Sequence, residues 1–111
     1  MEEQTSGFIE EQKYIKIINM MPIFCLDFLI NCDDKYLLIK RLNEPLKGNY
    51  WVPGGRLRFK ETIDSAAKRI QKKELGRYHS DYKLIGFSNY FFKKKIFSRA
   101  LHTPTLLYSI S

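Results

Sequence analysis

The chain has 111 residues, of which 44% are hydrophobic and 28% charged, and its net charge at neutral pH is +7. This length suits one small domain with a single core, and this balance of residues is typical of globular rather than disordered chains. The longest apolar run is short and contains Asp27, which excludes a membrane-spanning helix. The N-terminus, MEEQTSGFIEEQKY, lacks the basic start and apolar core of a signal peptide, so we expect a cytoplasmic protein.

The positive charge is concentrated near the C-terminus. Residues 82–111 contain no acidic residue and five basic ones: Lys83, Lys93, Lys94, Lys95 and Arg99. Such a segment is typical of a solvated lysine run, or of a surface that binds nucleic acid. No RNA-binding pattern accompanies it, which disfavours nucleic acid as a partner.

The first half of the chain predicts β-structure. Residues 14–31 are rich in β-branched and aromatic residues and favour a strand that is broken near Pro22. The turn sequence NCDDK leads to a second predicted strand over residues 36–42, and the two strands suggest a hairpin. Short strands are also predicted at YWV and, further on, at RLRF (residues 56–59).

One helix is predicted in the second half. Apolar residues at helical spacing occupy residues 62–75, with Thr62 as a plausible N-cap and Gly76 as a C-terminal stop. Residues 82–92 favour another strand, whereas the structure of the ending, from residue 96, stays open. Strands on both sides of one helix predict a single α+β domain over residues 1–111.

A Gly-Gly pair, Gly54 and Gly55, lies between strand and helix in the stretch WVPGGR. We expect a turn here, at which the backbone can approach a ligand closely because glycine has no side chain. The partial positive charge of the helix N-terminus would favour an anion nearby.

Charged residues around this pair suit phosphate and a metal ion. Arg41, Arg56 and Arg69 carry guanidinium forks that match phosphate oxygens. Glu74 offers the oxygen ligand that Mg²⁺ prefers. Each of these residue types is also common on ordinary surfaces, so the chemistry depends on their spacing.

The spacing of Gly55, Glu61, Arg69, Glu74 and Gly76 resembles the Nudix box, and the preceding strands look like the same family. The resemblance implies a mixed β-sheet packed with a helix that carries the box. Ordinary Nudix pyrophosphohydrolases use several carboxylates to hold metals that activate water for attack on phosphorus.

The box is modified in this chain, because Ile70 and Lys73 replace two of its glutamates. These two positions and Glu74 share one helix face, which is left with a single carboxylate. This departure argues against an ordinary pyrophosphohydrolase.

The chain is more similar to the GDP-mannose mannosyl hydrolases, a Nudix branch that lacks the same two glutamates. The stretches MPIFCLDFLIN, LLIKRLNEPLKGNYWVPGGR and KETIDSAAKRI carry this resemblance. It implies Mg²⁺-dependent hydrolysis of GDP-mannose, or of a related GDP-hexose, to GDP and free sugar by attack at the anomeric carbon. It also implies a small nucleotide-sugar as the binding partner and a homodimer as the assembly.

The resemblance further implies roles for the residues of the modified box. Glu74 and the backbone carbonyl of Gly54 would ligate Mg²⁺, and Arg56 and Arg69 would be catalytic by stabilising the leaving diphosphate. Glu61 is expected to be structural and to pair with an arginine across the start of the helix.

Residues outside the box are expected to bind the substrate. Arg41 would contact the nucleotide, the ring of Tyr14 would stack on guanine, and Asp27 would lie near the sugar. Trp51 and Phe28 are expected in the core instead.

The general base has no counterpart in this chain. The family places a histidine base, with a glutamine metal ligand, in a loop beyond the next strands, and neither His79 nor His102 matches that position. Similarity ends near Phe92, so we interpret residues 93–111 as a divergent basic tail and hypothesise that the gene is truncated or out of frame from about Lys93. The sheet would then lack its last strands and expose an unpaired edge. A catalytically inactive remnant that binds nucleotide is therefore an alternative.

Overall fold

The structure, a computed structural model, describes residues 8–42, 47–92 and 101–111. The helices and strands of these residues, in chain order, are α2 (Glu11–Ile18), β1 (Cys25–Cys32), β2 (Lys35–Tyr36), β3 (Ile39–Lys40), β4 (Tyr50–Trp51), β5 (Gly54–Arg56), α3 (Ile63–Leu75), β6 (Lys83–Phe92) and β7 (Leu101–Ile110). Strands on both sides of α3 confirm the α+β class that the sequence predicts.

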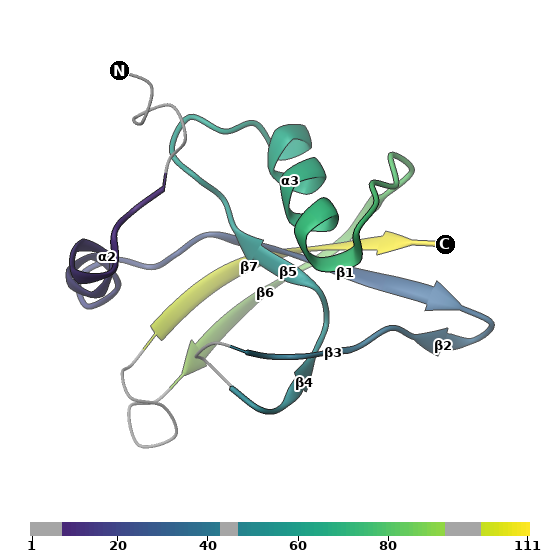
Figure 1. Ribbon diagram of the computed structural model, residues 1–111, viewed down its shortest axis with the longest axis horizontal. Coiled ribbons are helices and arrows are strands. Elements are labelled where there is room, and N and C mark those ends of the chain that lie inside the picture. The colour runs from purple at the N-terminus through teal and green to yellow at the C-terminus, as the bar shows by residue number, and fades with distance from the viewer. Residues whose placement is uncertain (1–7, 43–46, 93–100) are drawn as a thin grey trace.

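Five of the strands form one mixed sheet, shown in Figure 1. The order is β2-β1-β7-β6, and β5 pairs with the same edge of β1 as β2 does. The pairing of β1 with β7 is parallel, whereas β6 is antiparallel to β7. β3 and β4 form a separate antiparallel pair, with Ile39 opposite Trp51.

The core lies between this sheet and α3. Leu26 and Phe28 of β1 and Ile110 of β7 are almost fully buried, and they pack with Ala67 and Ile70 of α3. The expectation that Phe28 is a core residue is therefore confirmed. Because α3 rests across β1 and next to β5, its position relative to the sheet is set by this apolar cluster.

The ends of α3 follow the sequence closely. The Thr62 hydroxyl accepts a hydrogen bond from the backbone N–H of Ser65 at 3.1 Å, which satisfies a donor that the helix itself cannot use. Gly76 ends the helix with φ of 80°, a left-handed conformation that glycine adopts without strain.

The predicted hairpin between β1 and β2 is present. Asp33 and Asp34 have φ of 53° and 64°, the sign that a two-residue type I′ turn requires. The second predicted strand, residues 36–42, is interrupted, because only Tyr36 falls within β2 and only residues 39–40 fall within β3.

Residues 101–110 correct the expectation of a sheet without its last strands. They form β7, which lies between β1 and β6 and pairs with both along most of its length. Thr105, Tyr108 and Ile110 are buried on it. The lysine run and Arg99 lie outside the described residues.

Two further sequence predictions are wrong. Residues 14–18 belong to α2 rather than to a strand, because the Glu10 side chain caps the helix by accepting from the N–H of Lys13 at 3.1 Å. The Gly54-Gly55 pair lies in β5, so it is part of a strand rather than a turn, and β5 begins before the strand predicted at RLRF.

No helix among the described residues is long and apolar enough to cross a membrane.

Candidate functional site

Two adjoining pockets share β5 as a common wall. The first, here called the sheet pocket, has a volume of about 160 Å³ and opens on the face of the sheet that carries Asp27 and Thr105. The second, here called the helix pocket, has a volume of about 270 Å³ and lies between β5 and the second half of α3. Both pockets are lined by Gly54, Gly55 and Arg56 and by Tyr14 of α2.

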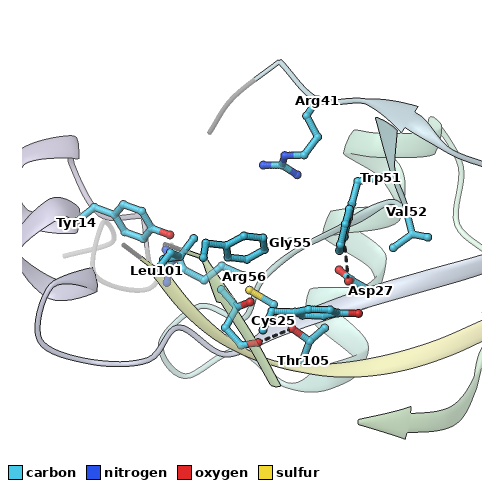
Figure 2. Close-up of a pocket in the computed structure, with 14 residues that line it drawn as sticks. Tyr14, Cys25, Asp27, Arg41, Trp51, Val52, Gly55, Arg56, Leu101 and Thr105 are labelled. Atoms are coloured by element: carbon cyan, nitrogen blue, oxygen red, sulfur yellow. Dashed lines mark hydrogen bonds between the residues drawn. The ribbon is translucent and has the colours of Figure 1, made fainter. Parts of the chain in front are cut away.

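The sheet pocket brings together the residues that the sequence assigned to substrate binding. Tyr14, Asp27 and Arg41 all line it, although they come from α2, β1 and the end of β3. Figure 2 shows Arg41 and Trp51 entering from one side, above Asp27 and Cys25 of β1. The remaining lining residues belong to the segment before β5 and to β6 and β7: Val52, Tyr90, Phe92, Leu101, Thr103 and Thr105.

Asp27 is the buried acid of this pocket. The indole Nε1–H of Trp51 donates to its Oδ2 at 3.5 Å (Figure 2). Burial raises the pKa of Asp27 to about 6, and the Trp51 hydrogen bond and the charge of Arg41 only partly oppose this rise. Trp51, which we expected in the core, is half-buried and lines the pocket instead.

Tyr14 and Arg56 meet where the two pockets adjoin. The guanidinium carbon of Arg56 lies 6.0 Å from the centroid of the Tyr14 ring, within range of a cation–π contact. Its Nη1 donates to the carbonyl of Leu57 at 3.3 Å. Burial lowers the pKa of Arg56, and the neighbouring charges of Arg58 and Arg69 act in the same direction.

Arg69 is held by acceptors within the protein. Its Nε and Nη2 donate to the two carboxylate oxygens of Glu61 at 2.7 and 2.8 Å, and Nη2 also donates to the carbonyl of Arg56 at 2.7 Å. Glu61 accepts a further bond from the backbone N–H of Arg58 at 3.0 Å. These bonds lower the pKa of Glu61 and tie α3 to β5 and to the loop before the helix.

The modified positions of the box have different environments. Ile70 is 2% exposed and belongs to the core cluster. Lys73 is exposed and Glu74 half-buried, and both line the helix pocket. Glu74 is therefore the only carboxylate among the described residues that line this pocket, against the cations of Arg56, Arg58, Arg69 and Lys73.

Close packing leaves no room for a side chain at Gly54 and little room at Gly55. A Cβ on Gly54 would overlap the carboxylate of Asp27 and lie 2.7 Å from the carbonyl oxygen of Leu26. A Cβ on Gly55 would lie 3.1 Å from Cγ1 of Ile70. The pair thus lets β5 pass between β1 and α3, whatever ligand the pockets hold.

The donor set suits one Mg²⁺ ion that shares its coordination with a ligand. Gly54 and Glu74 both line the helix pocket, and a backbone carbonyl and a carboxylate are hard oxygen ligands. Among residues 8–42, 47–92 and 101–111, no three His, Cys, Asp or Glu side chains are grouped to hold a metal ion. Since Mg²⁺ commonly keeps several waters and binds substrate phosphates, one carboxylate is enough when a diphosphate is present.

The two histidines lie away from both pockets. The backbone N–H of His79 donates to Gln71 Oε1 at 2.7 Å, beyond the end of α3. The ring of His102 stacks on Phe91 and lies 2.6 Å from Asn89 Oδ1. Neither histidine is among the residues that line the two pockets.

Several lining residues were not found from the sequence. Ser88, Tyr90 and Phe92 alternate along β6, so that Tyr90 and Phe92 face the sheet pocket together. The alternation of side chains along the predicted strand could have indicated that Tyr90 and Phe92 share one face. Arg58 and the N-terminal Phe8 line the helix pocket, and no pattern in the sequence indicated it.

Comparisons with known proteins bear on the fold of the chain. No family model matches the chain. Over 65 residues it is 40% identical to an ADP-ribose pyrophosphatase of Methanocaldococcus jannaschii, an alignment covering 59% of this chain and 38% of the relative. Over 68 residues it is 34% identical to the low-salt glycan biosynthesis protein Agl8 of Haloferax volcanii, covering 61% of this chain and 44% of that protein. The chain therefore aligns with less than half the length of either relative.

The solved structure of the NUDIX domain of Shewanella oneidensis NrtR, complexed with ADP ribose, matches 99% of this chain and 70% of its own with a TM-score of 0.65. The chain has the Nudix fold. The identity over this match is 14%, so the likeness concerns the fold alone. The Nudix-type sheet and helix that the sequence predicted are thereby confirmed.

Proposed function

We propose that this chain is a Mg²⁺-dependent hydrolase of a nucleoside-diphosphate sugar, with GDP-mannose or a related GDP-hexose as the substrate. The products are GDP and the free sugar, and the bond broken is the one between the anomeric carbon and oxygen. The observation that carries this proposal is the composition of the helix pocket, where Ile70 is buried and Lys73 and Glu74 line the wall.

A single carboxylate suits substitution at carbon better than attack on phosphorus. Attack on phosphorus calls for a metal-activated hydroxide and a cluster of carboxylates to hold several ions. Departure of a diphosphate from the sugar needs instead that its developing negative charge be neutralised. The basic side chains of the helix pocket, with Arg56 at the boundary, meet that need.

The proposal assigns the two pockets to different parts of the substrate. Arg41, Tyr14 and Asp27 line the sheet pocket, so the nucleoside and sugar groups would contact it. The diphosphate would lie across β5 towards Arg56 and Glu74. Glu74 and the Gly54 carbonyl would hold Mg²⁺, which when bound supplies positive charge to the departing diphosphate.

Arg69 takes a different role from the one that the resemblance implied. Two of its nitrogens already donate to Glu61 and to the carbonyl of Arg56. We therefore propose that Arg69 is a positioning residue that fixes β5 and hence Arg56. Glu61 is proposed as its structural partner.

An ordinary Nudix pyrophosphohydrolase is the second candidate. The relative from Methanocaldococcus jannaschii, at 40% identity over 65 residues, is named an ADP-ribose pyrophosphatase. That candidate predicts cleavage within the diphosphate, and ADP-ribose as a substrate. It requires metal sites beyond those that Gly54 and Glu74 offer.

Product analysis separates the candidates. We expect incubation with GDP-mannose and Mg²⁺ to release GDP and mannose. Release of GMP and mannose 1-phosphate, or turnover of ADP-ribose alone, would support the pyrophosphohydrolase. If neither substrate turns over while GDP still raises the melting temperature, the chain is a nucleotide-binding remnant.

Replacement of Glu74 tests the metal assignment. We expect Glu74→Gln to abolish the Mg²⁺-dependent turnover because the pocket loses its one anionic ligand. Turnover that is unchanged in Glu74→Gln would contradict the assignment.

The homodimer implied by the resemblance is a separate prediction, which light scattering of the purified protein tests.

A further inference from the structure

Three aromatic side chains form one wall of the sheet pocket. Trp51 comes from β4, and Tyr90 and Phe92 lie two residues apart on β6. The rings of Trp51 and Tyr90 meet edge to face with 5.7 Å between their centroids, and those of Tyr90 and Phe92 are stacked at 6.3 Å. We call these three residues the aromatic wall. It brings the β3–β4 pair into contact with β6 of the main sheet.

Packing in the core does not account for the aromatic wall. Each of its three side chains is only half-buried, and none belongs to the core cluster of the described residues. Phe91, between Tyr90 and Phe92, is 67% exposed and stacks on His102 instead of lining the pocket. Alternation along β6 thus places Tyr90 and Phe92 in the pocket and Phe91 outside it. The half-buried rings offer apolar surface that a ligand in the pocket can cover.

The aromatic wall lies against a buried carboxylate. The indole N–H of Trp51 donates to Oδ2 of Asp27 (Figure 2). This bond uses one of the roughly four acceptor positions of a carboxylate. Asp27 is 7% exposed and lines the same pocket. A ligand in this part of the pocket therefore meets aromatic rings and hydrogen-bond acceptors side by side.

This combination of groups matches a hexose. A pyranose ring has C–H groups on its faces and hydroxyl groups around its edge. The weakly positive C–H groups are attracted to the negative face of an aromatic ring, and the hydroxyl groups donate to a carboxylate.

The position of Asp27 also favours the hexose over the nucleobase. Asp27 pairs with Gly54 of β5, the strand across which the diphosphate is proposed to lie. In a nucleoside-diphosphate sugar the hexose is joined directly to the diphosphate, whereas the ribose separates the base from it. The group next to β5 on the side of Asp27 and Trp51 is therefore expected to be the hexose.

We propose that the aromatic wall, together with Asp27, binds the hexose, and that the ring of Tyr90 contacts the sugar directly. The inference rests on the proposed function for the position of the diphosphate, but not for the bond that is broken. It makes Trp51 and Tyr90 the residues through which the chain distinguishes a nucleoside-diphosphate sugar from the nucleotide alone.

Calorimetric titration with two ligands in the presence of Mg²⁺ tests the inference. One ligand is GDP, and the other is an analogue of GDP-mannose in which a methylene group replaces the anomeric oxygen, so that the sugar cannot be released. Tyr90→Leu removes the ring but keeps an apolar side chain. We expect this variant to bind the analogue about fivefold more weakly than the wild type, and to bind GDP within about twofold.

Trp51→Leu is a second variant on a different strand, for which we expect the same selective loss, so a folding defect in one variant leaves the other as the test. Tyr90→Phe and Phe91→Ala are the controls. The first keeps the ring, and the second removes a neighbouring ring outside the pocket. We expect both controls to bind both ligands within about twofold of the wild type, and a thermal melt of each variant checks that it is folded.

Three results would overturn the inference. Equal weakening of both ligands in Tyr90→Leu would show that the ring contacts the nucleoside. Analogue binding that is unchanged in Tyr90→Leu and Trp51→Leu, or absent in the wild type, would show that the aromatic wall holds no sugar. Release of mannose from GDP-mannose alongside any of these results would leave the proposed function standing. Selective loss of analogue binding in a chain that releases no sugar would instead defeat the proposed function alone.

Discussion

Asp27 shows how burial and charge oppose each other within the site. Its pKa rises from 3.8 to about 6, chiefly because burial disfavours the ionised form. When the pKa of a carboxyl group is higher in the folded state than in the unfolded state, its protonated form favours folding. This stabilisation is complete at pH values below the unfolded-state pKa. That contribution is lost as the pH rises through the folded pKa.

We therefore expect Asp27→Asn to gain stability relative to the wild type between about pH 4 and pH 7, reaching on the order of 2 to 3 kcal/mol. Asparagine can still accept the bond from Trp51, so the effect comes from the charge. Urea unfolding in EDTA across this pH range measures it. The exposed Asp81→Asn variant serves as the control, and a stability difference that does not change with pH would contradict the account.

The Glu61–Arg69 pair holds β5 against α3, and its loss should be costly. Glu61→Gln leaves the Arg69 guanidinium without its charged acceptor, so we expect the free energy of unfolding to fall by about 1 to 3 kcal/mol. Chemical denaturation measures the change. Glu74→Gln, a change on α3, should lose little stability by comparison, and equal losses in the two variants would argue that Glu61 has no structural role.

The sequence predicted the positions of some site residues correctly and those of others incorrectly. Tyr14, Asp27 and Arg41 were assigned to one site by resemblance, and they do line one pocket. Trp51 was misplaced because a lone tryptophan beside a strand is usually buried. Its indole instead faces the acid of a neighbouring strand, which sequence spacing does not reveal.

At the scale of elements, β5 is held at close range on both sides. We expect Gly54→Ala to destabilise the protein strongly, because the added Cβ would meet the Asp27 carboxylate and the Leu26 carbonyl. Gly86→Ala is the matched control, since there the nearest atom, Leu107 Cδ1, would lie at an ordinary 3.8 Å. Thermal melts of both variants measure the difference, and similar melting temperatures would refute the packing argument.

Strand β7 gives the second prediction at this scale. A chain that ends at residue 100 loses the strand between β1 and β6, together with the buried Tyr108 and Ile110. We expect it not to fold, because β6 would have no partner in the sheet and the core would be open. Far-UV circular dichroism and a urea melt test this. A cooperative transition would show that residues 101–111 are dispensable.

The helices and strands differ in how far the sequence reveals them. α3 was predicted to within a residue, because Thr62, the apolar spacing and Gly76 all agree. α2 was missed because its isoleucines favour strands, and the cap that Glu10 provides was not recognised. The structure of β7 stayed open since buried threonines such as Thr103 and Thr105 hide its alternation.

The whole molecule joins segments that are far apart in the chain. The two pockets draw on α2, β1, the β3–β4 pair, β5, α3, β6 and β7. Physical patterns predicted the α+β class and the main helix, but they could not bring Tyr14 next to Arg56. Resemblance to the GDP-mannose mannosyl hydrolases assigned Tyr14 to the base and Arg56 to the diphosphate, whereas the contact between these two side chains is seen only in the structure.

The central claim is that the chain breaks the sugar carbon–oxygen bond of a nucleoside-diphosphate sugar. Hydrolysis of GDP-mannose with Mg²⁺ in water enriched in oxygen-18, followed by mass spectrometry of the nucleotide product, tests it most directly. When water attacks the anomeric carbon, its oxygen enters the sugar and all oxygen atoms of the diphosphate stay in the GDP. We therefore expect GDP without label. Oxygen-18 in the GDP, or labelled GMP or mannose 1-phosphate in its place, would contradict the account.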